Sequence, residues 1–113
     1  MRHLPAAALV AASCFATPAM AGFLGGVDLY GHCTAPSIDE RYICVSYIMG
    51  VIDTTQNLLP KTDPGRACIP DGASAQATVD SIISYIKDDK ERRDSPAEIL
   101  VGHALKTLFP CKG

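Results

Sequence analysis

Hydrophobic positions recur at helical spacing along most of the chain after residue 22. The longest such stretch, residues 37–59, contains no proline and a single glycine, Gly50. Ser37 and Glu40 at its start have the spacing of a capping box, in which two side chains satisfy unpaired backbone amides. Because apolar residues cover nearly the whole circumference, the pattern predicts a long central helix that is buried nearly all round. Its most regular apolar face consists of Ile38, Tyr42, Val45, Met49 and Ile52.

Three shorter helices are predicted around this one. Residues 27–33 form the first of them, and residues 74–87 carry a clean amphipathic stripe (Ala75, Val79, Ile82, Ile83 and Ile86). Ser95, Pro96 and Glu98 combine an N-cap, a first-turn proline and a capping-box acid, which starts a helix over 96–109 that Pro110 stops. The sequence therefore predicts an all-α fold, an orthogonal or bundle-like packing of about four helices around the long one.

Two segments between the helices stand out. Residues 60–72 hold three prolines and two glycines, which indicates a loop, and this loop is longer than a helix–helix turn requires. Residues 88–94 are all charged, a composition that is typical of a solvated turn.

The N-terminal residues read as a secretory signal peptide over 1–21. A short basic start is followed by an apolar, alanine-rich run that ends in Ala19-Met20-Ala21, an A-x-A cleavage site. The apolar run is too short for a stable membrane span. An alternative is a lipoprotein signal that attaches lipid to Cys14, but Ala11 stands where such signals prefer leucine. Residues 22–113 are then one small exported domain.

The net charge of the domain argues against two classes of partner. Removing the leader takes away Arg2 and leaves nine basic side chains against 12 acidic ones, a net charge of −3. An acidic domain is a poor candidate for binding nucleic acid or an anionic membrane.

Four cysteines remain after the leader, and an even number in a short exported chain implies two disulfides. Spacing alone allows three pairings. If helices 74–87 and 96–109 form an antiparallel hairpin, Cys68 before the first lies beside Cys111 after the second. This arrangement leaves Cys33 to pair with Cys44. The chain has no C-x-x-C pair, so neither a zinc site nor a thioredoxin-like motif is expected.

Enzymatic activity is not expected. His103 falls on an outer helix face, and His32 adjoins a cysteine whose sulfur is predicted to be in a disulfide and so is no nucleophile. Asp53 is a single carboxylate on a helix, which is weak grounds for a general base. The common hydrolase, metalloprotease and phosphate-loop motifs are missing from the sequence, and no cofactor or metal is predicted.

Five groups of short motifs follow one another along the chain after the leader. They are Leu29, Tyr30, Cys33; Cys44, Tyr47, Ile48, Gly50, Asp53; Cys68, Ile69, Pro70, Gly72, Gln76; Tyr85, Ile86, Glu91, Arg93, Ala97; and Ala104, Leu105, Phe109, Pro110, Cys111. In this order the motifs resemble the Rap/Tai family of immunity proteins, which protect bacteria with type VI secretion against their own peptidoglycan amidase toxins. The resemblance covers nearly the whole chain after the leader. One departure is Lys90, where the family pattern has proline before the glutamate.

The resemblance implies an all-helical periplasmic protein, often a homodimer, that binds a toxin amidase and blocks its cleft without catalysis. It also implies mostly structural roles for the motif residues. The alternative reading is a small periplasmic chaperone or stress-protective binding protein, which would expose apolar surface in acid. We expect Gly50 to be a packing residue at a close helix crossing or subunit contact.

The partner-binding surface is expected on exposed segments outside the core. The favoured one is the loop, with Lys61, Asp63 and Arg66, whose joint replacement by alanine should leave folding almost intact. The charged turn, with Asp89, Lys90 and Arg92, is the second. A polar strip on the long helix could instead face a partner or second subunit; it comprises Asp39, Ser46, Asp53 and Asn57.

Overall fold

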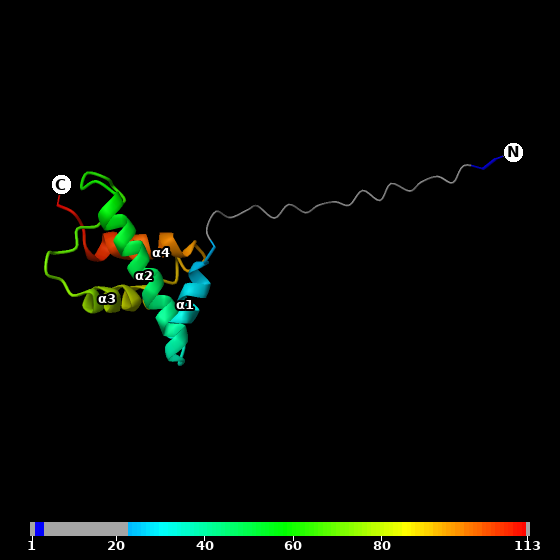
Figure 1. The fold of residues 1–113 in the computed structure, drawn as a ribbon, viewed down its shortest axis with the longest axis horizontal. Coiled ribbons are helices and arrows are strands. Elements are labelled where there is room, and N and C mark those ends of the chain that lie inside the picture. Colours follow the sequence, from blue (N-terminus) through cyan, green and yellow to red (C-terminus); the bar gives the residue numbers. More distant parts are fainter. Residues whose placement is uncertain (1, 4–22, 113) are drawn as a thin grey trace.

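The computed structural model describes residues 2–3 and 23–112, and it shows four helices (Figure 1). These are α1 (Gly26–Thr34), α2 (Ile38–Leu58), α3 (Ala75–Asp88) and α4 (Ala97–Leu108). Within the described residues there is no strand, only an isolated bridge between Gly25 and Pro96. The predicted all-α class with four helices is confirmed.

Predictions about the leader fall largely outside this region. Residues 4–22, which include most of the predicted signal peptide and Cys14, lie outside the described residues. Of the helices that the structure describes, none combines the length and apolar character needed to cross a membrane.

The core of the domain is centred on α4. All five of its inward side chains (Ala97, Leu100, Val101, Ala104 and Leu105) are at most 1% exposed. Leu29 of α1, Ile48 of α2 and Ile82 of α3 pack into the same cluster. On α3 the predicted inner positions Val79, Ile82 and Ile86 are buried, but Ala75 at the start of the helix is exposed.

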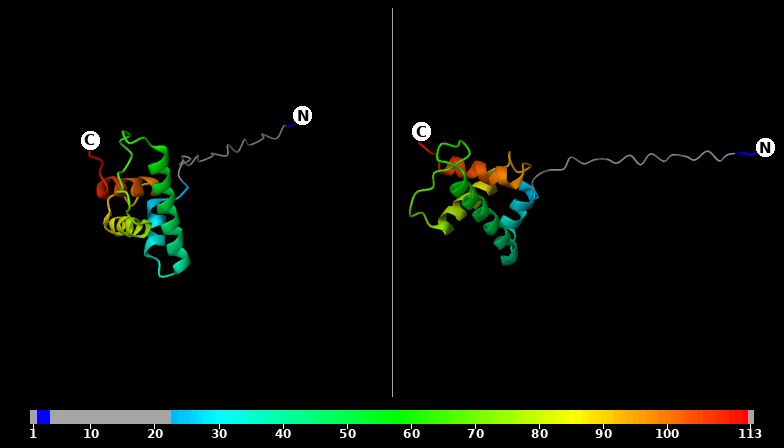
Figure 2. Two further views of the ribbon diagram at one scale, coloured as in Figure 1. Left: turned by 60° about the vertical axis from the view of Figure 1, so that its left-hand side comes forward. Right: turned by 45° about the horizontal axis from the view of Figure 1, so that its top comes forward.

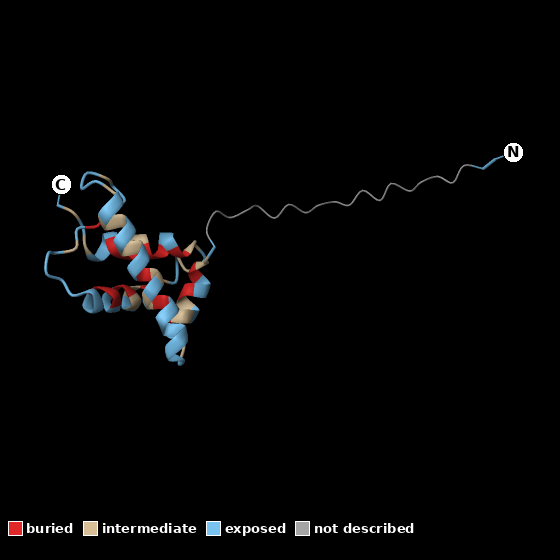
Figure 3. Cartoon of the chain, viewed as in Figure 1, coloured by how far each residue is buried: buried red, intermediate tan, exposed pale blue. Residues whose placement is uncertain are grey.

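The prediction that the long helix is buried nearly all round is wrong. α2 contacts each of the other three helices, but only Cys44 and Ile48 of its 21 residues are buried (Figure 3). Ile38 is 59% exposed and Tyr42 is 62% exposed. The other helices are shorter and lie on one side of α2, so they cover one side of its apolar surface (Figure 2).

Two predicted caps also differ from the structure. Ser37 makes no side-chain cap bond, and Glu40 instead pairs with Nδ1 of His32. At α4 the N-cap is Pro96 rather than Ser95, because backbone from the start of the domain takes the place of a side-chain cap. The amide of Ala97 donates to Leu24 O at 3.0 Å, and the amide of Gly26 donates to Ser95 O at 2.8 Å.

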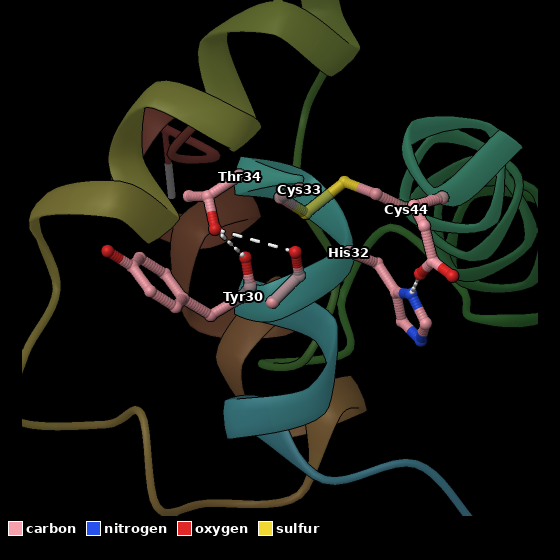
Figure 4. Close-up of a disulfide and its surroundings, with 7 residues drawn as sticks. Tyr30, His32, Cys33, Thr34 and Cys44 are labelled. Atoms are coloured by element: carbon pink, nitrogen blue, oxygen red, sulfur yellow. Dashed lines mark hydrogen bonds and ion pairs between the residues drawn. A yellow bond between two sulfur atoms is a disulfide. The ribbon is translucent and has the colours of Figure 1, made fainter. Parts of the chain in front are cut away.

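Both predicted disulfides are confirmed. Cys33–Cys44 joins α1 to α2 beside the His32–Glu40 contact (Figure 4). Cys68–Cys111 joins the loop before α3 to the end of α4, where Cys68 N also donates to Phe109 O at 2.8 Å. With its neighbour Cys33 oxidised, His32 has no thiolate to activate.

Candidate functional site

A groove with a volume of about 800 Å³ runs between α2 and α4. Tyr47 and Val51 of α2 face Ile99 and His103 of α4 across it. Gly65 of the α2–α3 loop and Arg92 of the α3–α4 turn also line the groove. It therefore connects the two segments that the sequence singled out for partner binding.

Each of the two helices presents a glycine to this groove. A Cβ at Gly50 or at Gly102 would meet no atom within 4 Å. The prediction that Gly50 packs at a close helix crossing is therefore wrong within this chain. Glycine inside a helix costs about 1 kcal/mol relative to alanine. Packing within the chain does not require a glycine at either position. The open space beside the two glycines therefore needs another explanation.

Tyr47 and Glu98 form a polar contact between the two walls. Burial raises the pKa of the Tyr47 phenol, and the negative charge of the nearby Glu98 carboxylate adds to the shift. This contact engages the one acidic side chain that lines the groove in the described part of the chain.

Farther along α4, His103 and Lys106 lie on the groove wall. The His103 ring packs near the Tyr85 ring, with centroids 5.9 Å apart, and its Nε2 lies 3.4 Å from Thr107 Oγ1. Lys106 is exposed and has no ion-pair partner among residues 2–3 and 23–112.

The loop residues predicted to bind a partner have different roles in the structure. Arg66 Nη1 donates to the carbonyls of Gln56 and Leu59 at 2.5 and 2.6 Å, and so closes the end of α2. Asp63 Oδ1 accepts from Gly65 N at 2.7 Å and shapes the turn. Lys61 alone of the three is exposed. The expectation that replacing all three would hardly affect folding is therefore wrong, because Arg66 caps a helix.

The charged turn is folded rather than merely solvated. The Asp89 side chain is 7% exposed and accepts from both the backbone amide and Nη1 of Arg92, each at 3.3 Å. The Arg93 guanidinium stacks 3.7 Å from the centre of the Tyr30 ring and donates to Lys87 O. These contacts tie α1 to the end of α3, and Lys90 is left exposed at the tip.

The motif residues divide into two groups. Gly72 has φ of +87°, a left-handed conformation that favours glycine, and Ala97 is fully buried. Phe109 and Tyr85 are half-buried against the core. Structural roles at these positions are visible, whereas the following side chains are exposed: Asp53, Pro70, Gln76 and Pro110, together with Asp39, Ser46 and Asn57 of the polar strip.

The α4 wall of the groove was not identified from the sequence, which placed Ile99, His103 and Lys106 on a solvated outer face. The one signal that could have found it is the second mid-helix glycine, Gly102, which had no assigned role. In the part of the chain that the structure describes, no cluster of three or more His, Cys, Asp or Glu could hold a metal ion.

Four helices joined by two disulfides, with an open groove flanked by two ordered segments, define a small binding domain. The sequence profile of Rap1a immunity proteins matches residues 25–111, which include all four helices, both disulfides and every residue of the groove. The chain belongs to the Rap1a immunity protein family. A comparison with curated proteins gave no match.

Proposed function

We propose that this protein is a periplasmic immunity protein that binds and blocks a type VI secretion peptidoglycan amidase toxin, and that it catalyses no reaction. Its membership of the Rap1a immunity protein family over residues 25–111 carries the proposal. Two disulfides suit an oxidising compartment such as the periplasm, and the predicted leader would direct the chain there.

The contact surface that we propose is formed by the exposed tips of the loop and the charged turn. Lys61 and Lys90 project from segments whose own hydrogen bonds hold them in shape. A binding segment that is already ordered loses less conformational entropy when it contacts a partner. Arg66, Asp63, Asp89 and Arg92 contribute to this surface mainly by fixing the backbone that carries the two lysines.

The test uses protein purified from the periplasm of cells that express the full-length chain, together with any peptidoglycan amidase toxin that is found to be encoded beside its gene. Calorimetry should detect a complex, and the complex should no longer hydrolyse peptidoglycan. Lys61→Glu should weaken binding at least fivefold, because a charge on the rim of an interface steers association. Its melting temperature should stay unchanged.

Arg41→Glu is the matched control, since Arg41 is also exposed and lies near the start of α2, at the opposite end of that helix from the loop. If the amidase binds the wild-type protein and Lys61→Glu with equal affinity, the contact does not involve the loop. No binding and no inhibition by the wild-type protein would contradict the proposed function itself.

We also propose that the protein forms a homodimer through α2. Ile38, Tyr42 and Met49 are each more than 40% exposed, and Val45 and Ile52 between them are half-buried. These five side chains form one stripe at spacings of three and four residues, the pattern by which two helices pair. A contiguous exposed apolar patch of this kind marks an interaction surface.

The double variant Tyr42→Glu with Met49→Glu should be monomeric under conditions in which the wild-type protein is a dimer. Sedimentation equilibrium measures this directly. Thr54→Glu places one such charge on the other flank of α2 and should remain dimeric. A wild-type protein that is monomeric at high micromolar concentration would contradict the dimer, and a dimeric double variant would place the interface elsewhere.

A further inference from the structure

We propose that the α2–α4 groove receives an extended segment of the toxin that carries an apolar side chain and a carboxylate. This inference rests on the function proposed above and adds the site and the chemistry of the segment. Arg92 of the charged turn and Gly65 of the loop both line the groove, so a segment lying in it would contact both ordered surface segments.

The shape of the groove favours a strand of backbone over a bulky group. Gly50 and Gly102 leave one position on each helix without a side chain, and a Cβ added at either position finds open space. A partner backbone can therefore approach the helices closely. The two glycines lower helix stability and the chain's own packing does not require them, so an occupant of the groove accounts for both.

The walls set which side chains the segment carries. Val51 is half-buried and Ile99 is 54% exposed, so they offer a partner an apolar surface that has no cover in the described chain. Burying such surface contributes about 25 cal/mol per Å². We therefore assign an apolar side chain to the middle of the segment.

Charge complementarity assigns the carboxylate. Of the charged side chains that line the groove within the described residues, Arg92 and Lys106 are cations and Glu98 is the single acid. Asp89 engages Arg92 Nη1, so Lys106 is the groove cation that has no ion-pair partner among the described residues. In a chain of net charge −2, this cation selects an acidic group on the toxin.

The test combines filling the groove with reversing its free charge, measured by calorimetry against the same amidase. Gly102→Leu should weaken binding at least tenfold without lowering the melting temperature, because its side chain enters open space. Lys106→Glu should also weaken binding at least tenfold and should flatten the dependence of affinity on salt concentration. The variants are made in the full-length chain.

Two controls match these changes. Gly31→Leu adds the same side chain at another open helical glycine, on α1 and outside the groove, and Arg41→Glu reverses another exposed cation outside the groove. Both should bind within twofold of the wild-type protein. If Gly102→Leu lowers the melting temperature, the affinity of Lys106→Glu for the amidase is the measurement that tests the inference.

Full affinity in Gly102→Leu and Lys106→Glu, with a wild-type protein that binds, would overturn this inference and leave the proposed function standing. A wild-type protein that does not bind the amidase would overturn both. If Gly102→Leu instead alters the oligomeric mass in the absence of toxin, the groove belongs to a second copy of this chain, which also overturns the assignment to the toxin.

Discussion

Replacing Cys68 and Cys111 together with alanine should lower the free energy of unfolding by about 4 kcal/mol, according to the loop-entropy relation. The disulfide closes a loop with a sequence separation of 43 residues, so it strongly restricts the unfolded chain. Domains of this size have a total stability of roughly 5–15 kcal/mol. Losing this one bond would therefore remove between about a quarter and about four fifths of that stability.

The folded state should be affected around the same bond. Cys68 follows Ala67, which is 1% exposed and whose carbonyl accepts from Gln56 Nε2 at 3.0 Å. Next to it, Arg66 holds the end of α2 through two carbonyls. Without the disulfide, the backbone bond from Cys68 to Phe109 is what remains to hold this part of the loop against α4.

Urea unfolding followed by circular dichroism measures the effect. The double variant Cys33→Ala with Cys44→Ala is the comparison, because its separation of 11 residues predicts a smaller loss of about 3 kcal/mol. A Cys68/Cys111 variant within 1 kcal/mol of the wild-type protein would contradict the prediction. The slope of free energy with urea must be compared too, since a changed slope reports a changed unfolded state.

The helices and the disulfides were predictable because they follow from local signals. Prolines at 36, 60, 64, 70 and 110 mark where helices cannot continue, and the stripes on α3 and α4 identify their inner faces. Once α3 and α4 are taken as a hairpin, the positions of Cys68 and Cys111 fix the pairing. None of these steps requires knowledge of how far apart the helices lie.

The burial of α2 was not predictable in this way. A helical pattern shows which side chains are apolar but not how many neighbours are available to cover them. Here three shorter helices lie on one side of a helix of 21 residues, so Tyr42 and Met49 stay exposed. The sequence pattern that we took for a buried core face is instead the surface that we propose for dimerisation.

The candidate site required tertiary geometry for the same reason. Gly50 and Gly102 are far apart in the sequence, and only the placement of α2 beside α4 shows that they face one space. In the sequence, Arg66 looked like a surface cation. Its hydrogen bonds run to carbonyls at the end of α2, seven and ten residues earlier, and the sequence pattern does not reveal them. Charge alone does not distinguish a free arginine from one that caps a helix.

Gly26→Ala should destabilise the protein by about 3 kcal/mol, although it adds a single methyl group. A Cβ at Gly26 would lie 2.5 Å from Arg93 O and 2.6 Å from Ser95 O. Both contacts are with backbone atoms, so a change of side-chain rotamer cannot relieve them. The start of α1 would have to move away from the segment that precedes α4.

That movement would break the pairing that takes the place of a cap on α4. The Gly26 amide donates to Ser95 O at 2.8 Å, and the Ala97 amide donates to Leu24 O at 3.0 Å. Each such bond contributes about 1 kcal/mol, and an amide left buried without an acceptor costs more. The Ala97 amide is especially sensitive to this loss. Its side chain is buried in the core, so no water can replace the lost acceptor.

Gly31→Ala is the matched control, because Gly31 lies in the same helix and a Cβ there meets nothing within 4 Å. It should raise stability by up to about 1 kcal/mol, the gain expected for alanine over glycine in a helix. The two variants should therefore shift the melting temperature in opposite directions in differential scanning calorimetry. A Gly26→Ala protein as stable as the wild-type protein would mean that α1 and the α3–α4 turn separate easily. The stack of Arg93 on Tyr30, which joins the same two elements, would then contribute little to holding them together.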